Sequence, residues 1–285
     1  MTIKTIKDKF TLGLQDLYPS EEIQSFFIML SESFLNYSRI DIFLKQAEVL
    51  SEEKTNKYFD ALKRLQNQEP VQYIIGSTEF FGLVFNVNSA TLIPRPETEE
   101  LVRWVLENER GVEMDTILDI GTGSGCIAIA LASELPNAVV CGLDISEDAI
   151  KVAKENAKQN NVAVHFSYTD VLITNSLPGM FSCIVSNPPY VRDSEKDQMA
   201  SNVLENEPAS ALYVSNEDPL LFYRKIAQLA KKHLVEGGQL FFEINEYLGK
   251  EMIALLRSEG YHEIQIRKDM FGKDRMLRCV FKRID

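Results

Sequence analysis

The sequence predicts an α/β protein with a mostly parallel sheet and an antiparallel last strand, preceded by a small all-α domain. Up to about residue 73, apolar residues recur three and four positions apart, the spacing of amphipathic helices. From Thr116 onward, short apolar runs alternate with helical segments, which is typical of a parallel sheet covered by helices. Only a loop separates the last two predicted strands, and parallel neighbours need a longer crossover, so one of them should run antiparallel.

The predicted helical domain covers residues 1–73. Its clearest helices are expected over residues 20–37 and 51–68. Ser20 and Ser51 each stand before a pair of glutamates and are predicted N-caps, because a serine hydroxyl accepts from free N–H groups and acidic side chains suit the helix dipole.

A hairpin is expected next, in a linker over residues 74–95. Aromatic and β-branched residues flank Gly82 there, which favours two short strands joined by a turn. A helix over residues 97–106 then follows near the start of the second domain, residues 96–285.

The second domain is predicted to alternate strands with helices on both faces of the sheet. The expected strands are residues 116–120, 138–144, 164–170, 181–187, 239–244, 262–268 and 276–282. The expected helices are residues 126–135, 146–160, 221–234 and 250–260.

The composition is that of an ordinary globular protein, with 45% hydrophobic and 25% charged residues. No apolar run approaches the ~20 residues that span a bilayer, and residues 1–10 lack the apolar core of a secretory signal. The cysteines Cys126, Cys141, Cys183 and Cys279 form no C-x-x-C pair, so we expect neither a metal site nor disulfides. A cytoplasmic protein outside the membrane is predicted.

The charge balance weighs against a nucleic-acid partner. The formal net charge is −12, and no dense block of Lys and Arg is present. Proteins that grip a nucleic-acid backbone usually present a basic surface, because phosphate contacts supply much of the affinity.

The glycine-rich segment Gly121–Gly125 follows a predicted strand and precedes a helix. Glycines there let a ligand approach the main chain, although a tight turn would use them as well. Asp144 ends the next strand, where an acidic side chain can bind ribose hydroxyls. Cys126 replaces the third glycine of a dinucleotide motif, so the segment favours an adenosyl ligand without a pyrophosphate. Asp170 could accept from an adenine amino group or cap its own loop.

Asn187-Pro188-Pro189-Tyr190 follows another predicted strand, at the sheet edge where α/β proteins bind ligands. The prolines stiffen this segment. The Asn187 side-chain oxygen and the Pro188 main-chain oxygen could accept the two hydrogens of a planar –NH2 group and aim its nitrogen at a methyl donor. Tyr190 would pack against the planar group. Because an amide nitrogen is a poor nucleophile, placement and polarisation must supply most of the catalysis.

With both motifs present, the sequence resembles the class I methyltransferases, which have a Rossmann-like fold, and more closely the release factor glutamine methyltransferases of the PrmC/HemK family. The matching features span nearly the whole chain: the helical N-terminal region, IPRPETE, LDIGTGSGCIAIAL, SNPPYV, ENEPASAL and FGKDR. The Asn-Pro-Pro-Tyr element also occurs in adenine and guanine amino-methyltransferases, so the substrate choice depends on the IPRPETE stretch and the helical N-terminus.

The resemblance implies methyl transfer from S-adenosylmethionine, with S-adenosylhomocysteine as product, to the glutamine of the Gly-Gly-Gln loop in class 1 peptide chain release factors. It also implies the site residues. The expected cofactor-binding residues are Gly121, Thr122, Gly123, Ser124, Gly125, Asp144, Ile145, Asp170, Val171 and Asn187, with Val171 standing where some relatives carry an aromatic residue. The expected substrate-binding residues are Asn187, Pro188, Pro189, Tyr190, Arg95 and Glu97, and of these Asn187, Pro188 and Tyr190 are expected to be catalytic.

Three other functions stay open at this point. A nucleic-acid amino-methyltransferase would use the same Asn-Pro-Pro-Tyr geometry on a base. A nicotinamide-dependent oxidoreductase is disfavoured by the glycine spacing. A binding module without turnover would keep the donor pocket, but the intact Asn187 and Tyr190 argue against it. Arg95 and Glu97 could shape the mouth of the site, or they could act only locally, through an ion pair and a helix start.

Overall fold

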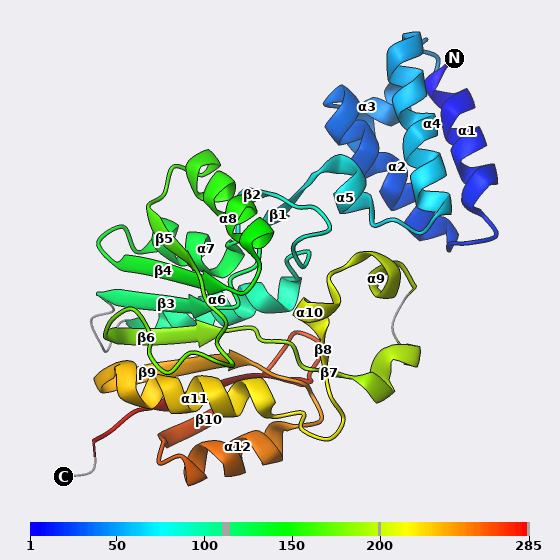
Figure 1. Cartoon of the computed structure of the whole chain (residues 1–285). Helices are drawn as coiled ribbons and strands as arrows, with labels where there is room; N and C mark the ends of the chain where they lie inside the picture. Colours follow the sequence, from blue (N-terminus) through cyan, green and yellow to red (C-terminus); the bar gives the residue numbers. More distant parts are fainter. Residues whose placement is uncertain (110–114, 199–200, 284–285) are drawn as a thin grey trace. The chain divides into compact units, whose positions relative to one another are not determined.

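The computed structural model describes residues 1–109, 115–198 and 201–283. They form two compact units (Figure 1). The first unit comprises Met1–Ser77 and residues 201–206, and the second comprises the other described residues. The predicted bounds, 1–73, 74–95 and 96–285, stay predictions. No helix in these ranges combines the length and apolar character that crossing a bilayer requires.

The first unit is mainly helical, as the apolar spacing predicts, with one isolated β-bridge between Thr2 and Val49. Its helices are α1 (Ile3–Leu14), α2 (Ser20–Leu35), α3 (Arg39–Leu44), α4 (Glu52–Gln66), α5 (Val71–Ile75) and α9 (Ser201–Asn206). The ring of Tyr58 stacks on Phe27 in its core with centroids 5.3 Å apart, and the Tyr58 hydroxyl lies 2.7 Å from Ser31 Oγ. Helix α9 comes from far along the sequence, and the Asn206 side chain donates to the main-chain oxygen of Gln68.

One of the two predicted N-caps is confirmed and the other is wrong. Ser51 caps α4, because its hydroxyl accepts from the main-chain N–H of Lys54 at 3.3 Å. Ser20 is instead the first helical residue of α2 and makes no capping bond. Pro19 occupies the N-cap position with extended geometry, and its carbonyl accepts from the N–H groups of Glu22 and Ile23.

The second unit is built on a seven-stranded sheet in the order β10-β11-β9-β6-β3-β4-β5. The strands are β3 (Thr116–Ile120), β4 (Val139–Asp144), β5 (Val164–Tyr168), β6 (Phe181–Ser186), β9 (Leu234–Glu243), β10 (His262–Lys268) and β11 (Asp274–Val280). The last strand, β11, runs antiparallel to both of its neighbours, and the other adjacent pairs are parallel. The predicted fold class is therefore confirmed.

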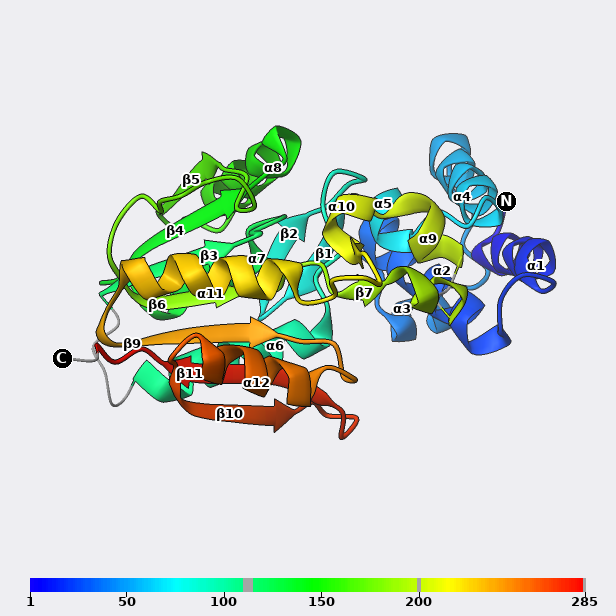
Figure 2. The same cartoon turned by 60° about the horizontal axis from the view of Figure 1, so that its bottom comes forward.

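Helices cover both faces of this sheet (Figure 2). Helices α6 (Pro96–Glu109), α7 (Cys126–Glu134) and α8 (Glu147–Gln159) pack on one face around Trp104 and Phe241, whose rings meet edge to face. Helices α11 (Leu221–His233) and α12 (Gly249–Ser258) pack on the other face, around Tyr223 and Phe242. The sheet is thus the middle of three layers.

The expected hairpin is present as β1 (Ser77–Phe80) and β2 (Leu83–Asn86). The buried side chain of Asn156 on α8 ties β2 to the glycine loop: it accepts from the Asn86 N–H and donates to the main-chain oxygens of Asn86 and Ser124. Phe80 and Phe85 are buried in the core of the second unit. The hairpin is therefore part of that unit's packing.

The long loop after β6 contains short elements that the sequence did not predict. They are β7 (Val191–Arg192), the 3-10 helix η1 (Asp193–Gln198), α10 (Ala209–Leu212) and β8 (Tyr213–Val214), and β7 pairs with β8 in parallel. This chain segment returns to the carboxyl edge of the sheet, where β3, β4, β5 and β6 also end.

Candidate functional site

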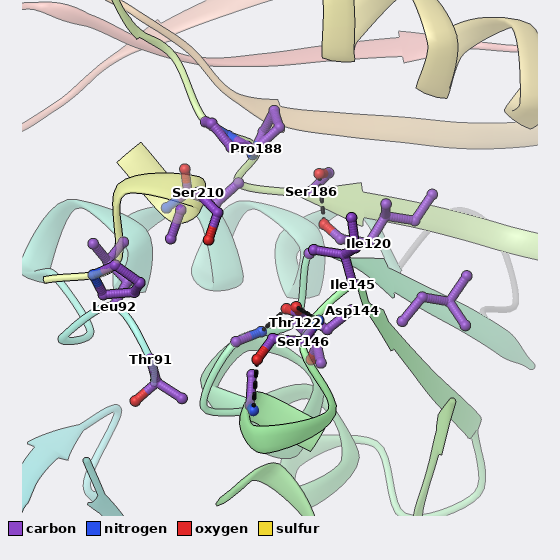
Figure 3. A pocket seen from close by; sticks show the side chains of 18 of the residues that line it. Thr91, Leu92, Ile120, Thr122, Asp144, Ile145, Ser146, Ser186, Pro188 and Ser210 are labelled. Carbon is purple, nitrogen blue, oxygen red and sulfur yellow. Dashed lines mark hydrogen bonds between the residues drawn. The ribbon is translucent and has the colours of Figure 1, made fainter. Parts of the chain in front are cut away.

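A cavity of about 270 Å³ lies within the second unit at the carboxyl edge of the sheet. Its walls come from the loops after β3, β4, β5 and β6, from the segment before α6, and from α10. In Figure 3, Pro188 and Ser210 lie on one side, and Thr122, Asp144 and Ser146 lie on the other. Both predicted motifs therefore border one cavity.

The glycine loop bends so that part of its main chain faces open space. Gly123 has φ +55°, and a Cβ added to it would meet no protein atom within 4 Å. Gly121 has φ +76°, and a Cβ there would lie 3.9 Å from the main-chain oxygen of Asn187. The loop thus leaves room for a ligand beside the Asn-Pro-Pro segment.

Gly125 has a different role from the two glycines before it. A Cβ at this position would lie 2.9 Å from Ile129 Cδ1 and 3.2 Å from both Ala153 and Phe166. The residue also has φ +83° and serves as the N-cap of α7. Gly125 therefore allows close packing of α7 against α8 and β5, and it is not among the cavity-lining residues of the described chain.

Thr122 of the glycine loop is held in place by a hydrogen bond to the buried Asp119. Its hydroxyl donates to Asp119 Oδ2 at 2.6 Å, and both residues are buried. Burial raises the pKa of Asp119 to about 7. This hydrogen bond fixes the second residue of the glycine loop to the end of β3.

Asp144 ends β4 and closes the loop from the other side. Its Oδ2 accepts from the N–H of Gly123 at 2.8 Å, and its Oδ1 accepts from the N–H of Ser146 at 2.9 Å. Burial raises its pKa. Each carboxylate oxygen keeps a second lone pair, so Asp144 can still accept from a ligand hydroxyl.

The residues after β5 form a third wall. Asp170 Oδ1 accepts from the N–H of Leu172 at 2.9 Å, so this aspartate does cap its own loop. It also lines the cavity, together with Val171 and Ile145. Ile145 is 50% exposed, which leaves an apolar surface at the cavity wall without a protein cover.

Asn187 is held by a chain of hydrogen bonds that the sequence did not predict. Its Nδ2 donates to Thr98 Oγ1 at 3.3 Å, and Thr98 Oγ1 donates to Glu243 Oε2 at 2.6 Å. The Tyr190 hydroxyl donates to Glu243 Oε1 at 3.0 Å. Glu243 is only 1% exposed, and this burial raises its pKa. The network joins the end of β6 to α6 and β9.

A second carboxylate secures the wall that Arg95 belongs to. Glu207 Oε1 accepts from Arg95 at 2.6 Å, and Glu207 Oε2 accepts from the N–H of Ile93 at 3.2 Å. The Glu207 side chain is 1% exposed, whereas that of Arg95 is 33% exposed. Glu207 therefore fixes the segment before α6 to the start of α10, and one face of Arg95 stays on the cavity.

The chain matches the methyltransferase small domain over residues 98–214 and the PrmC N-terminal domain over residues 14–76. It is 46% identical to a release factor glutamine methyltransferase of Flavobacterium psychrophilum, over 99% of this chain and 100% of the relative.

A relative with the same name in Bacteroides thetaiotaomicron is 43% identical over 93% of this chain and 95% of its own length. The chain belongs to the release factor glutamine methyltransferase family. A solved methyltransferase of Pyrococcus furiosus shares the fold, with a TM-score of 0.52 at 20% identity over 72% of this chain and 91% of that one.

In this member of the family, most of the predicted site residues line the cavity at the carboxyl edge of the sheet. They are Arg95, Gly121, Thr122, Gly123, Ser124, Asp144, Ile145, Asp170, Val171, Asn187, Pro188 and Pro189. Tyr190 and Glu97 are not among the cavity-lining residues of the described chain. The Tyr190 ring packs against the core beneath α11 and α12. Its predicted contact with the methyl-accepting group stays a prediction.

Thr98, Glu207 and Glu243 are three of the polar residues at the site that were not predicted. Thr98 lies in the IPRPETE stretch and Glu207 in ENEPASAL. The resemblance to the family singled out both stretches, but it did not single out these two side chains. Glu243 ends the apolar strand β9. A charged residue at the end of an apolar strand is the feature of the sequence that could have indicated its role.

Proposed function

We propose that this protein transfers a methyl group from S-adenosylmethionine to the side-chain amide nitrogen (N5) of the glutamine in the Gly-Gly-Gln loop of class 1 peptide chain release factors. The observation that carries the proposal is that Asn187 and Pro188 border the same cavity as the glycine loop and Asp144. Membership of the release factor glutamine methyltransferase family supports the substrate.

The residues present fit S-adenosylmethionine. The open space beside Gly123 suits the methionine part, Asp144 can accept from ribose hydroxyls, and the uncovered surface of Ile145 with Val171 suits a flat adenine ring. Asp170 Oδ2 can accept from the adenine amino group. When bound, the sulfonium supplies an electrophilic methyl group.

The protein's part in the reaction is to place and polarise the glutamine amide. Asn187 Oδ1 and the Pro188 main-chain oxygen accept its two N–H hydrogens, and the stiff Pro188-Pro189 pair holds these oxygens in place. These acceptors draw electron density toward nitrogen, where the conjugated lone pair is otherwise weakly nucleophilic. With the donor bound, the nitrogen held by Asn187 and Pro188 would take the methyl group as its bond to sulfur broke, and the nitrogen would lose one proton to solvent.

The helical first unit is proposed to bind the release factor away from the glutamine. A single glutamine can be selected only through contacts beyond the amide itself, since the acceptors at Asn187 and Pro188 read a group that every glutamine has. A variant without residues 1–73 that kept the full chain's affinity for the release factor would contradict this role.

The function is tested by incubating the protein with labelled S-adenosylmethionine and a purified class 1 release factor, and mapping the label by peptide mass spectrometry. Label is expected only on the Gly-Gly-Gln glutamine, and none on a factor in which that glutamine is replaced. Label on nucleic acid but none on the factor would instead favour an amino-methyltransferase acting on bases.

Asn187→Ala is expected to lower the rate by roughly 10²–10³-fold, because a fixed hydrogen-bond partner of the reacting group is lost. The matched control is Asn175→Ala, since Asn175 is exposed and is not among the cavity-lining residues of the described chain. Equal rates for the two variants would remove Asn187 from the mechanism.

A further inference from the structure

The side-chain amide of Asn187 has two ends of nearly the same shape and opposite chemistry. Oδ1 only accepts hydrogen bonds and Nδ2 only donates them. A half-turn of the amide exchanges the two ends without changing the space that it fills. A substrate –NH2 needs Oδ1, so an enzyme that lets this amide turn loses its acceptor for part of the time.

Thr98 distinguishes the two orientations. Its hydroxyl has one proton, and that proton is donated to Glu243 Oε2 at 2.6 Å. Toward Asn187, Thr98 Oγ1 therefore presents only lone pairs, which can accept from Nδ2 at 3.3 Å but cannot pair with Oδ1. Thr98 is 3% exposed, so water does not readily replace its partners.

Glu243 fixes the direction of the whole chain of hydrogen bonds. Burial favours the protonated form of Glu243, but hydroxyl donors occupy both of its oxygens, Thr98 on one and Tyr190 on the other, and these two bonds favour the ionised carboxylate, which only accepts. The carboxylate is buried at the end of β9, where Glu243 pairs with Met276 of β11. Arg275, which lies beside Met276, contributes a favourable charge. The acceptor is thus held by the sheet itself.

We propose that Thr98 and Glu243 are positioning residues that hold the Asn187 amide with Oδ1 toward the methyl-accepting nitrogen. Neither residue needs to touch the substrate. The inference rests on the proposed function, in which Asn187 Oδ1 accepts from the glutamine amide.

The first test compares Thr98→Val with Thr98→Ser. Valine keeps the shape and removes the hydroxyl, whereas serine keeps the hydroxyl. At saturating S-adenosylmethionine, we expect kcat for the release factor to fall roughly 10–100-fold in Thr98→Val and less than about 3-fold in Thr98→Ser, with KM changed little in both. Thr174→Val is the control, because the Thr174 hydroxyl donates only within its own loop, to the main-chain oxygen of Ser176, and Thr174 is not among the cavity-lining residues of the described chain.

A double-mutant cycle separates positioning from general damage. If Thr98 acts through Asn187, then adding Thr98→Val to Asn187→Ala lowers kcat little further. A purely structural role would lower kcat by the same factor in both backgrounds. Wild-type kcat in Thr98→Val, or additive losses in the cycle, would overturn the proposal.

The second test reads the amide directly and needs no activity. In protein labelled with ¹⁵N-asparagine, the Asn187 side-chain NH2 signal is assigned by its absence in Asn187→Ala. We expect one of its protons to be shifted and protected from exchange in the wild type and in Thr98→Ser, and not in Thr98→Val. An unprotected wild-type signal would overturn the proposal even if Thr98→Val did not fold.

The two tests also separate this inference from the proposed function. If the wild type labels a different acceptor, the proposed function fails, while the NMR result still decides the orientation of Asn187. If the wild type labels the release factor glutamine and Thr98→Val does so equally well, only the inference fails.

Discussion

Asp119 is a buried acid on β3 that contacts the glycine loop through Thr122, and its role is structural. It accepts from the Thr122 hydroxyl at 2.6 Å, and burial raises its pKa from the ordinary value of 3.8 to about 7. The folded state therefore keeps a proton that the unfolded chain releases above about pH 4. The stability that this group contributes is fully present below the unfolded pKa and is lost as the pH rises through about 7.

Asp119→Asn should remove this pH dependence. Between pH 5.5 and 8, the free energy of unfolding of the wild type is expected to fall by roughly 2 kcal/mol relative to the variant, because only the wild type loses the buried proton. Urea denaturation at both pH values measures the difference. Asp16→Asn, at an exposed position, should behave as the wild type, and a parallel pH response of Asp119→Asn would show that the proton is held elsewhere.

At the residue scale, the sequence identified cavity-lining residues that stand in short motifs, and it did not identify residues that only packing brings together. Gly121, Asp144 and Asn187 stand in short motifs beside their strands, and all three border the cavity. Thr98 and Glu243 are 145 positions apart and meet only through packing of α6 on β9. Motif spacing and apolar periodicity cannot predict a contact between two residues so far apart in the sequence.

Among the elements, the bounds of two predicted strands agree fully with the structure. The predicted strands 116–120 and 262–268 match β3 and β10 to the residue. Strand β9 was predicted from residue 239 but begins at Leu234, because the strand continues through Gly237 and Gly238, which have low strand propensity. The short helices α9 and α10 were missed because so few residues show no periodicity.

The two serine positions predict a difference in helix stability. Ser51→Ala should lower the stability of the helical unit by about 1 kcal/mol, because the cap on α4 is lost. Ser20→Ala should cost nothing or stabilise α2 slightly, since Ser20 makes no capping bond and alanine is the better helix former. Thermal denaturation of the full chain checks the pair; equal effects would show that the Ser51 bond is not formed in solution.

For the whole molecule, the negative charge is unevenly divided along the sequence. Residues 1–77 contain nine basic and eleven acidic residues, so most of the net −12 belongs to the rest of the chain. An acidic character of the helical unit is therefore a weak basis for binding a basic partner surface. Long-range attraction of a basic release factor surface would come mainly from the more acidic second unit.

If that attraction assists binding, KM for the release factor should rise roughly 3–10-fold when salt is increased from 50 to 500 mM, because screening shortens the reach of the charges. The kcat at saturating factor should stay nearly constant and serves as the internal control. A KM that is unchanged or lower in high salt would show that the contacts are mainly apolar.

The place of β11 in the sheet also constrains how the chain can be assembled during synthesis. Strand β10 is made before β11, yet β11 is its only neighbour in the described sheet and also separates it from β9. Until β11 emerges, the main-chain N–H and C=O groups along one edge of β9 are unpaired and β10 has nothing to pair with, a state prone to misassociation. Because Glu243 pairs with Met276 of β11, the acceptor that orients Asn187 is fixed only in this last step. The nascent enzyme should therefore gain its donor pocket before it gains its activity.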